Sequence, residues 1–350
     1  MERPTGSVAW GRRVTFQEGV DYGLPQPLLE EIFQRVIVPD YLLRSDPGPQ
    51  RRPEVVLLGG QPGSGKSTTA SQFQREFADR GGLVWVTWDD LRPFHPDYER
   101  LLAERPTDMP DVTRPAARWW QDRAAEYLRA RRYNLLLEGG FRDPAAVLAT
   151  AERFAAADYA VHVSALAVPA LLSRLGIIER FARQADVAGT GRWTTAASHD
   201  ADYTGTIEVL RRAEASSAVS RISLLIRDGL VHENHRGPTG QWMTRVSAVD
   251  VLAEARNAPL SRLQRTALAN RLAGTLERLQ FADIAHPALD DMAAQVKQDL
   301  ALFAADLTRA LGHPHEPLTA PDTGVGTILP HTDPDLGLPP PEPPGLDLER

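Results

Sequence analysis

The feature that most constrains the fold is a glycine-rich loop set between an apolar stretch and a helical one. Residues 60–67 read Gly-Gln-Pro-Gly-Ser-Gly-Lys-Ser, which matches the phosphate-binding pattern G-x-x-x-x-G-K-[ST] at every fixed position. The apolar run VVLLG at 55–59 precedes the loop, and the helical stretch TTASQFQREFADR follows it. This strand–loop–helix context predicts an α/β protein that binds a nucleotide.

Each residue type in the loop suits the binding of phosphate groups. Glycines let the backbone turn so that N–H groups point at a phosphate, and the following helix N-terminus adds partial positive charge. We expect the Lys66 ammonium to reach the β- and γ-phosphates of ATP and the Ser67 hydroxyl to ligate Mg²⁺. The residues expected to bind ATP are Gly60, Gln61, Pro62, Gly63, Ser64, Gly65, Lys66, Ser67 and Thr68.

Apolar runs that alternate with helical segments predict the fold class. Such alternation implies right-handed βαβ units, and therefore an α/β fold with a phosphate-loop parallel sheet and helices on both faces. The sequence contains no N-K-x-D motif for reading guanine and no L-S-G-G-Q motif of transporter ATPases, so a small-molecule kinase is the natural interpretation. Strands are expected at residues 55–59, 83–88, 134–137, 160–168 and 222–226.

The 350 residues divide into four zones, which suits one large domain with additions. Residues 1–52 form a leader, and residues 53–250 carry the strand and helix pattern of a phosphate-loop kinase domain. Residues 251–312 are expected to form an all-helical C-terminal extension. Residues 313–350 are rich in proline and are expected to be disordered.

The leader is expected to contain one amphipathic helix. Apolar residues recur there at helical spacing between residues 27 and 38. Pro39 is expected to end this helix, because proline cannot continue the hydrogen-bond pattern.

Charge and composition limit the partners. The net charge of −7 disfavours a nucleic-acid partner, and the absence of cysteine excludes disulfides and thiolate metal sites. The N-terminus lacks the apolar stretch of about 7–15 residues that a signal peptide needs. No run approaches the roughly 20 apolar residues of a membrane-spanning helix. A cytoplasmic protein without a membrane partner is therefore expected.

Two carboxylates follow the second expected strand. Ligands of α/β folds bind beyond the carboxyl ends of the strands, where Asp89 and Asp90 lie. We expect this strand to pack close to the phosphate-loop strand, so that Asp89 accepts the proton of an attacking hydroxyl as general base. The alternative is that both aspartates only cap the next turn. His95 is a candidate for substrate binding and equally a candidate for holding the loop.

One glutamate and three arginines complete the set of candidate residues. Glu138 ends the third strand and is expected to bind hydroxyls of an acceptor, whose phosphate Arg142 would bind. Arg180 and Arg192 are expected to stabilise the charge of a transferring phosphoryl group, as arginines on the lids of small kinases do. The alternative for each is an ordinary turn or a solvated surface charge. Residues 198–200 read Ser-His-Asp, but three adjacent residues cannot converge as a catalytic triad.

The ordered motifs resemble the zeta toxin family. The matching elements are G-Q-P-G-S-G-K-S, D-x-L-R-x-x-H-P, N-L-L-L-E-G, G-x-I-E-R and R-x₆-H-D, and they span residues 53–230. The phosphate loop alone is unspecific, whereas the ordered remainder is much more specific. Members of this family phosphorylate UDP-N-acetylglucosamine with ATP, on a hydroxyl of the amino sugar. A small helical antitoxin that blocks the nucleotide site usually holds them inactive.

The resemblance implies that this chain is a UDP-N-acetylglucosamine kinase and the toxin of a toxin–antitoxin system, with an antitoxin as its partner. It implies Lys66 as the phosphate-binding lysine, Asp89 as the general base and Glu138 as a substrate-binding residue. It also implies Arg180 and Arg192 as arginines that flank the transferring phosphate.

Gly140 departs from the family pattern, in which a small polar residue is common after the E-G pair. Two alternatives therefore stay open. One is a kinase of another small hydroxyl acceptor, such as an antibiotic or a nucleotide. The other is a non-catalytic binding protein gated by nucleotide, against which the retention of Asp89 argues. The leader and the helical extension would act as internal inhibitors, bind an antitoxin, or only add packing.

Overall fold

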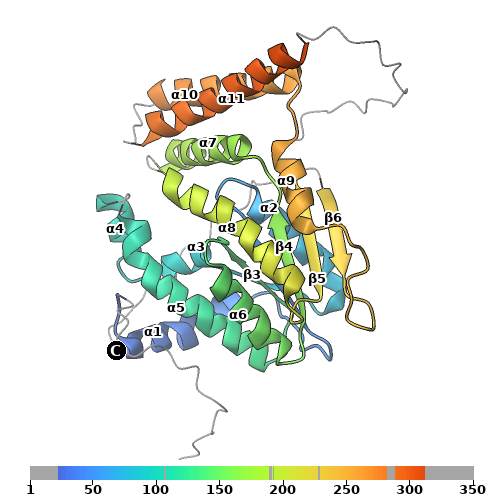
Figure 1. Cartoon of the computed structure of the whole chain (residues 1–350). Helices are drawn as coiled ribbons and strands as arrows, with labels where there is room; N and C mark the ends of the chain where they lie inside the picture. Colours follow the sequence, from blue (N-terminus) through green and yellow to red (C-terminus); the bar gives the residue numbers. More distant parts are fainter. Residues whose placement is uncertain are drawn as a thin grey trace, which may run out of the picture.

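One mixed sheet organises the computed structural model (Figure 1). The expected α/β class, with a mostly parallel sheet and additional C-terminal helices, is confirmed. The proline-rich tail, the beginning of the leader and Arg192 lie outside the described residues. The structure describes residues 23–105, 108–188, 191, 193–227, 229–281 and 288–311.

All five expected strands are present, and they run parallel to one another. The sequence analysis missed a sixth strand, which is antiparallel to the fifth, because its buried residues are the polar His232 and Asn234. The order across the sheet is β2-β3-β1-β4-β5-β6. The strands are β1 (Glu54–Gly59), β2 (Val84–Thr87), β3 (Leu135–Gly139), β4 (Ala160–Leu166), β5 (Arg221–Ile226) and β6 (Gly229–His235).

The strand order corrects one expectation about the site. The second strand in sequence does not pack on the phosphate-loop strand, because β3 lies between β1 and β2. Glu138 of β3 pairs with Leu58 of β1 on one side and with Thr87 of β2 on the other. Glu138 therefore lies near the end of the strand next to β1, and Asp89 follows the strand beyond it.

Helices cover both faces of the sheet, as expected (Figure 1). Alternate residues of β1 face opposite ways: Val55 and Leu57 belong to the apolar cluster that includes helices α1, α5, α6, α8 and α9, and Val56 and Leu58 pack with α2. The helices are α1 (Gln26–Ile32), α2 (Lys66–Glu76), α3 (Trp88–Leu91), α4 (Tyr98–Glu104), α5 (Met109–Ala130), α6 (Pro144–Ala155), α7 (Ala170–Ala188), α8 (Ala196–Ala215), α9 (Ala248–Asn257), α10 (Arg262–Phe281) and α11 (Leu289–Leu311).

The leader helix does not end at Pro39, so that prediction is wrong. After α1 the chain continues as a π-helical segment, Phe33–Leu42, that contains Pro39. A π turn links residues five apart, and its wider path accommodates a proline that would break an α-helix. Phe33, Ile37 and Leu42 are fully buried along this segment, so its packing on the core outweighs the local preference of the sequence.

The expected domain boundary at residue 250 falls inside α9. Ala248 and Leu252 of this helix are buried in the cluster that covers the sheet, so α9 belongs to the sheet domain. The extension proper is the α10–α11 hairpin, which packs on α7 through a separate apolar cluster. None of the described helices combines the length and the apolar character that a membrane crossing requires.

Replacement of Leu252 by Ala tests whether α9 belongs to the core. Leu252 is 1% exposed, so we expect Leu252→Ala to lower the free energy of unfolding by about 2–5 kcal/mol, whereas Glu254→Ala on the exposed face should leave it unchanged. Urea denaturation of the full chain measures both. Equal stability of the two variants would contradict the assignment of α9 to the sheet domain.

Candidate active site

A cleft of about 1730 Å³ opens where the parallel strands end. Its walls come from the phosphate loop, from the ends of β2 and β3, and from α7, α8 and α10. Small-molecule sites usually measure about 300–1,000 Å³, so this cleft has room for two ligands side by side.

The phosphate loop takes the shape that its glycines predict. Gly63 and Gly65 have φ values of 77° and 97°, in the left-handed region that favours glycine, and α2 begins at the next residue, Lys66. The Lys66 ammonium donates to the carbonyl oxygens of Gly60 and Gln61, at 3.0 and 3.1 Å. Burial lowers the pKa of Lys66, and the nearby carboxylate of Glu138 opposes this effect.

Most of the residues expected to bind ATP line the cleft, but two do not. The run from Pro62 to Thr68 faces the cavity, whereas Gly60 and Gln61 lie behind it. The buried Gln61 side chain points into the protein, where it donates to the Val168 carbonyl at 2.8 Å and to the Ser173 hydroxyl at 3.1 Å. Its side chain therefore braces the loop against neighbouring elements.

The two aspartates after β2 both line the cleft. Thr87 caps α3, since its hydroxyl accepts the backbone N–H of Asp89 at 3.4 Å, so the aspartates are not N-caps. An Asp89 carboxylate oxygen lies 3.4 Å from Nε of Arg92. Asp90 lies 3.3 Å from the hydroxyl of Tyr41, which the π-helical segment carries and which the sequence analysis did not single out. No signal in one sequence marks Tyr41.

Glu138 is an almost fully buried acid that lines the cleft. Its side chain is 7% exposed, and burial raises its pKa from 4.5 to about 7. Lys66 opposes this rise, and Asp89 and Asp90 add to it. The Trp85 indole N–H donates to its carboxylate at 3.0 Å. A carboxyl group that titrates near neutral pH within a cleft is typical of a functional site.

Arg142 lines the cleft and is fixed by a partner that the sequence analysis missed. It donates to both oxygens of Asp202 on α8, at 3.0 and 3.1 Å, and Asp202 is almost fully buried. A Cβ on Gly140 would lie 2.2 Å from an Asp202 oxygen. The departure from the family pattern at Gly140 therefore has a steric cause, because the Asp202 carboxylate occupies the space of a side chain.

The remaining candidates have three different outcomes. Arg180 of α7 lines the cleft and donates to the Thr194 hydroxyl at 2.8 Å. Arg192 lies outside the described residues. His95 does not line the cleft: it is buried, and its Nδ1 accepts the backbone N–H of Asp97 at 3.1 Å. That contact favours the loop-holding interpretation of His95.

The loop residues fit a magnesium ion held chiefly by nucleotide phosphates. The described residues contain no group of three or more His, Cys, Asp or Glu side chains arranged around a metal ion. Mg²⁺ usually takes only one or two protein ligands beside phosphate oxygens and water. The exposed Ser67 side chain, which lines the cleft next to Lys66, suits that role.

Comparisons with known proteins agree with this geometry. A sequence profile described as Zeta toxin matches residues 40–236. Toxin zeta of Streptococcus agalactiae is 31% identical over 179 residues, which are 51% of this chain and 62% of that protein. Toxin PezT of Streptococcus pneumoniae is 29% identical over 220 residues, which are 62% and 83% of the two chains.

A solved structure of the PezAT chromosomal toxin–antitoxin system of Streptococcus pneumoniae is similar to 74% of this chain and 98% of the other. Its TM-score is 0.61 and its sequence identity is 25%. The fold and the loop thus define a phosphate-loop α/β protein. Within that class the chain belongs to the zeta toxin family, because the family profile matches more than half of its length. The chain spans less than two thirds of the length of toxin zeta.

Replacement of Gly140 by Ala tests the close approach of Asp202. The new methyl group would overlap an Asp202 oxygen, so we expect Gly140→Ala to lower the free energy of unfolding by about 1–3 kcal/mol. Gly139→Ala is the matched control, since a Cβ there meets no atom within 4 Å. Denaturant titration compares the two, and equal losses would contradict the contact.

The raised pKa of Glu138 predicts how stability depends on pH. The folded protein holds the Glu138 proton more tightly than the unfolded chain does, so the bound proton contributes to the free energy of unfolding. This contribution is complete below pH 4.5 and is lost as the pH rises through about 7. Relative to Glu138→Gln, the wild type should lose on the order of 2–3 kcal/mol of unfolding free energy over that interval. Glu152→Gln, at an exposed position, is the control, and its free energy of unfolding should vary with pH as that of the wild type does. If the free energies of wild type and Glu138→Gln varied with pH in parallel, the raised pKa of Glu138 would be contradicted.

Proposed function

We propose that the chain is an ATP-dependent kinase that phosphorylates a hydroxyl of UDP-N-acetylglucosamine and acts in the cytoplasm as the toxin of a toxin–antitoxin system. One observation carries the proposal: Lys66, Asp89 and Arg180 line the same cleft, although they come from three separate segments. A binding protein that only switches conformation needs no carboxylate that activates an acceptor hydroxyl. Membership of the zeta toxin family supports the acceptor and the role.

The chemistry assigned to these side chains is a direct transfer of the γ-phosphoryl group. The Asp89 carboxylate takes the proton of the acceptor hydroxyl as the hydroxyl oxygen bonds to phosphorus and the bond to ADP breaks. Lys66 and Arg180 neutralise negative charge on the phosphoryl oxygens, as charge-assisted donors do in phosphoryl transfer. In the proposal Arg192 is a second arginine beside the phosphate, on the strength of the family resemblance.

In this proposal, residues of the cleft bind both substrates. Ser67 would hold Mg²⁺, which draws negative charge from the phosphates when bound. Trp85, Trp88 and Tyr98 also line the cleft, and their aromatic rings suit the nucleobase of the acceptor. Glu138 would accept hydrogen bonds from sugar hydroxyls, and Arg142 would bind the diphosphate.

A small helical antitoxin is the proposed partner. The PezAT structure that resembles this chain is described as a toxin–antitoxin system. The cleft would be the surface that such a partner covers, since occupation of the phosphate loop excludes ATP.

Transfer of phosphate from ATP to UDP-N-acetylglucosamine tests the function. We expect Lys66→Ala to lower kcat by about 10²–10³-fold through lost charge stabilisation, and Asp89→Asn by about 10²–10⁴-fold through loss of the base. Lys297→Ala and Asp250→Asn, exposed residues outside the cleft, are matched controls that should keep wild-type rates. Mass spectrometry of the phosphorylated nucleotide-sugar measures the rate of transfer by the wild type and by the four variants.

Two results would overturn the proposal. Binding of ATP with no transfer to UDP-N-acetylglucosamine would exclude this acceptor. Transfer that survives Asp89→Asn at the wild-type rate would exclude Asp89 as the base.

A further inference from the structure

The C-terminal hairpin reaches the cleft although it lies outside the residues that the family profile matches. That profile ends at residue 236, and the hairpin begins at Arg262. Arg271, Thr275 and Arg278 of α10 nevertheless line the cleft opposite the sheet domain. In Figure 1, α10 and α11 lie side by side along α7, on the side away from the sheet.

An apolar face joins the hairpin to α7. Leu171, Leu175 and Ile178 of α7 are buried in one cluster with the hairpin. The hairpin contributes Leu268 and Leu272 of α10, with further apolar side chains from α11. Helix α7 is therefore packed on two sides, by the hairpin on one and by the sheet domain on the other.

Charged pairs connect the same elements at positions that matter for the site. Nε and Nη2 of the Arg271 guanidinium donate to the Glu179 carboxylate, at 2.9 and 2.7 Å. Glu179 is the neighbour of Arg180, the arginine proposed to contact the transferring phosphate. The Arg174 guanidinium donates to Asp299 of α11 at 2.9 Å and to Asp200 of α8 at 3.0 Å.

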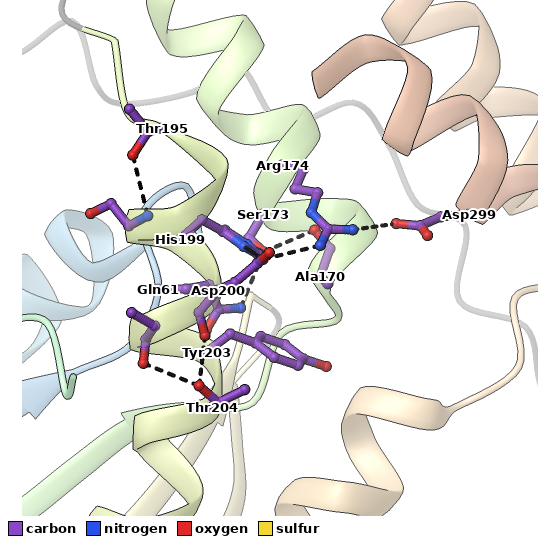
Figure 2. Close-up of polar contacts among 12 residues, drawn as sticks. Gln61, Ala170, Ser173, Arg174, Thr195, His199, Asp200, Tyr203, Thr204 and Asp299 are labelled. Atoms are coloured by element: carbon purple, nitrogen blue, oxygen red, sulfur yellow. Dashed lines mark hydrogen bonds and ion pairs between the residues drawn. The ribbon is translucent and has the colours of Figure 1, made fainter. Parts of the chain in front are cut away.

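A hydrogen-bonded chain continues from Arg174 to the phosphate loop, as Figure 2 shows. Asp200 lies 2.7 Å from Nδ1 of His199, and Nε2 of His199 lies 2.8 Å from the Ser173 hydroxyl. That hydroxyl accepts from the side chain of Gln61 in the loop. Ser173 and His199 are both fully buried. Ser173, His199 and Asp200 therefore form a structural hydrogen-bond network, and Ser173 is not an exposed nucleophile.

The donors and acceptors along this chain are consistent from end to end. Burial lowers the pKa of His199, so the neutral ring donates from Nδ1 to Asp200 and accepts the Ser173 proton at Nε2. Although burial opposes it, the hydrogen bonds from His199 and Arg174 hold the pKa of Asp200 below its ordinary value. Each hydrogen bond from Arg174 to Gln61 therefore joins a donor to an acceptor.

We propose that the α10–α11 hairpin is part of the nucleotide site: α10 forms one wall, and Asp299 is a positioning residue that holds α7 against the phosphate loop through Arg174. This inference rests on the proposed function. Helix α7 touches the loop without an intervening side chain, since a Cβ on Gly63 would lie 2.0 Å from the Ser173 carbonyl oxygen. A change in the seating of α7 is therefore transmitted to the loop that binds ATP.

The test is equilibrium binding of the Mg²⁺ complex of AMP-PNP, a non-hydrolysable ATP analogue, to the full chain by calorimetry. Asp299→Asn removes the charge that holds Arg174, and we expect it to weaken nucleotide binding about fivefold or more. Asp299→Glu keeps the charge and should restore most of the affinity. Asp291→Asn, an exposed carboxylate near the start of the same helix, is the matched control and should bind as the wild type does.

A second set of variants examines α10 directly. Arg271→Ala should weaken AMP-PNP binding, whereas Arg262→Ala, exposed at the start of α10, should not. In the transfer assay the hairpin variants should raise KM for ATP and leave KM for the acceptor unchanged, a pattern that general loss of stability does not give.

The outcomes separate the two proposals. Affinity of Asp299→Asn within twofold of a wild type that binds AMP-PNP would overturn the role of the hairpin and leave the kinase assignment standing. Equal losses in Asp299→Asn, Asp299→Glu and Asp291→Asn would also overturn it, because they would report general destabilisation. Tight AMP-PNP binding that depends on Asp299, without transfer to any acceptor, would support the hairpin's role and overturn the kinase assignment.

Discussion

Gly63 of the phosphate loop and Gly176 of α7 meet backbone to backbone, and the geometry of the cleft depends on this contact. A Cβ on Gly63 would lie 2.0 Å from the Ser173 carbonyl oxygen, and one on Gly176 would lie 2.6 Å from the carbonyl oxygen of Gly63. Close-packed interiors transmit small displacements instead of absorbing them. The seating of α7 therefore decides where Arg180 stands relative to the loop, and every element that packs on α7 takes part in building the site.

The order of the strands governs the electrostatics of the cleft. Because β3 lies between β1 and β2, Glu138 occupies the buried centre between the Lys66 ammonium and the two aspartates after β2. Burial raises the pKa of Glu138 to about 7, since the charged form loses its hydration and two further carboxylates lie near it. Acids of quite different exposure thus share one cleft: Asp89 has a side chain that is 44% exposed, whereas Glu138 is nearly enclosed.

Segments far apart in sequence supply the side chains that hold the candidate residues in position. Asp202 of α8 fixes Arg142 and fills the space beside Gly140. Tyr41, from a π-helical segment before the first strand, lies against Asp90. The α10–α11 hairpin follows the same principle at α7, where buried apolar contacts and charged pairs act together. Packing of this kind positions functional groups that their own local sequence leaves free to move.

The sequence by itself determined the phosphate loop and the five parallel strands, and it singled out several of the residues that line the cleft. These features are local, since a glycine-rich turn and an alternation of strand and helix follow from a few neighbouring residues. Only the tertiary structure decided the position of β3 between β1 and β2, the inward direction of Gln61, the place of His95 outside the cleft and the contribution of α10. Each of these depends on contacts between residues far apart in the chain, such as Gln61 with Ser173, and no local pattern encodes them.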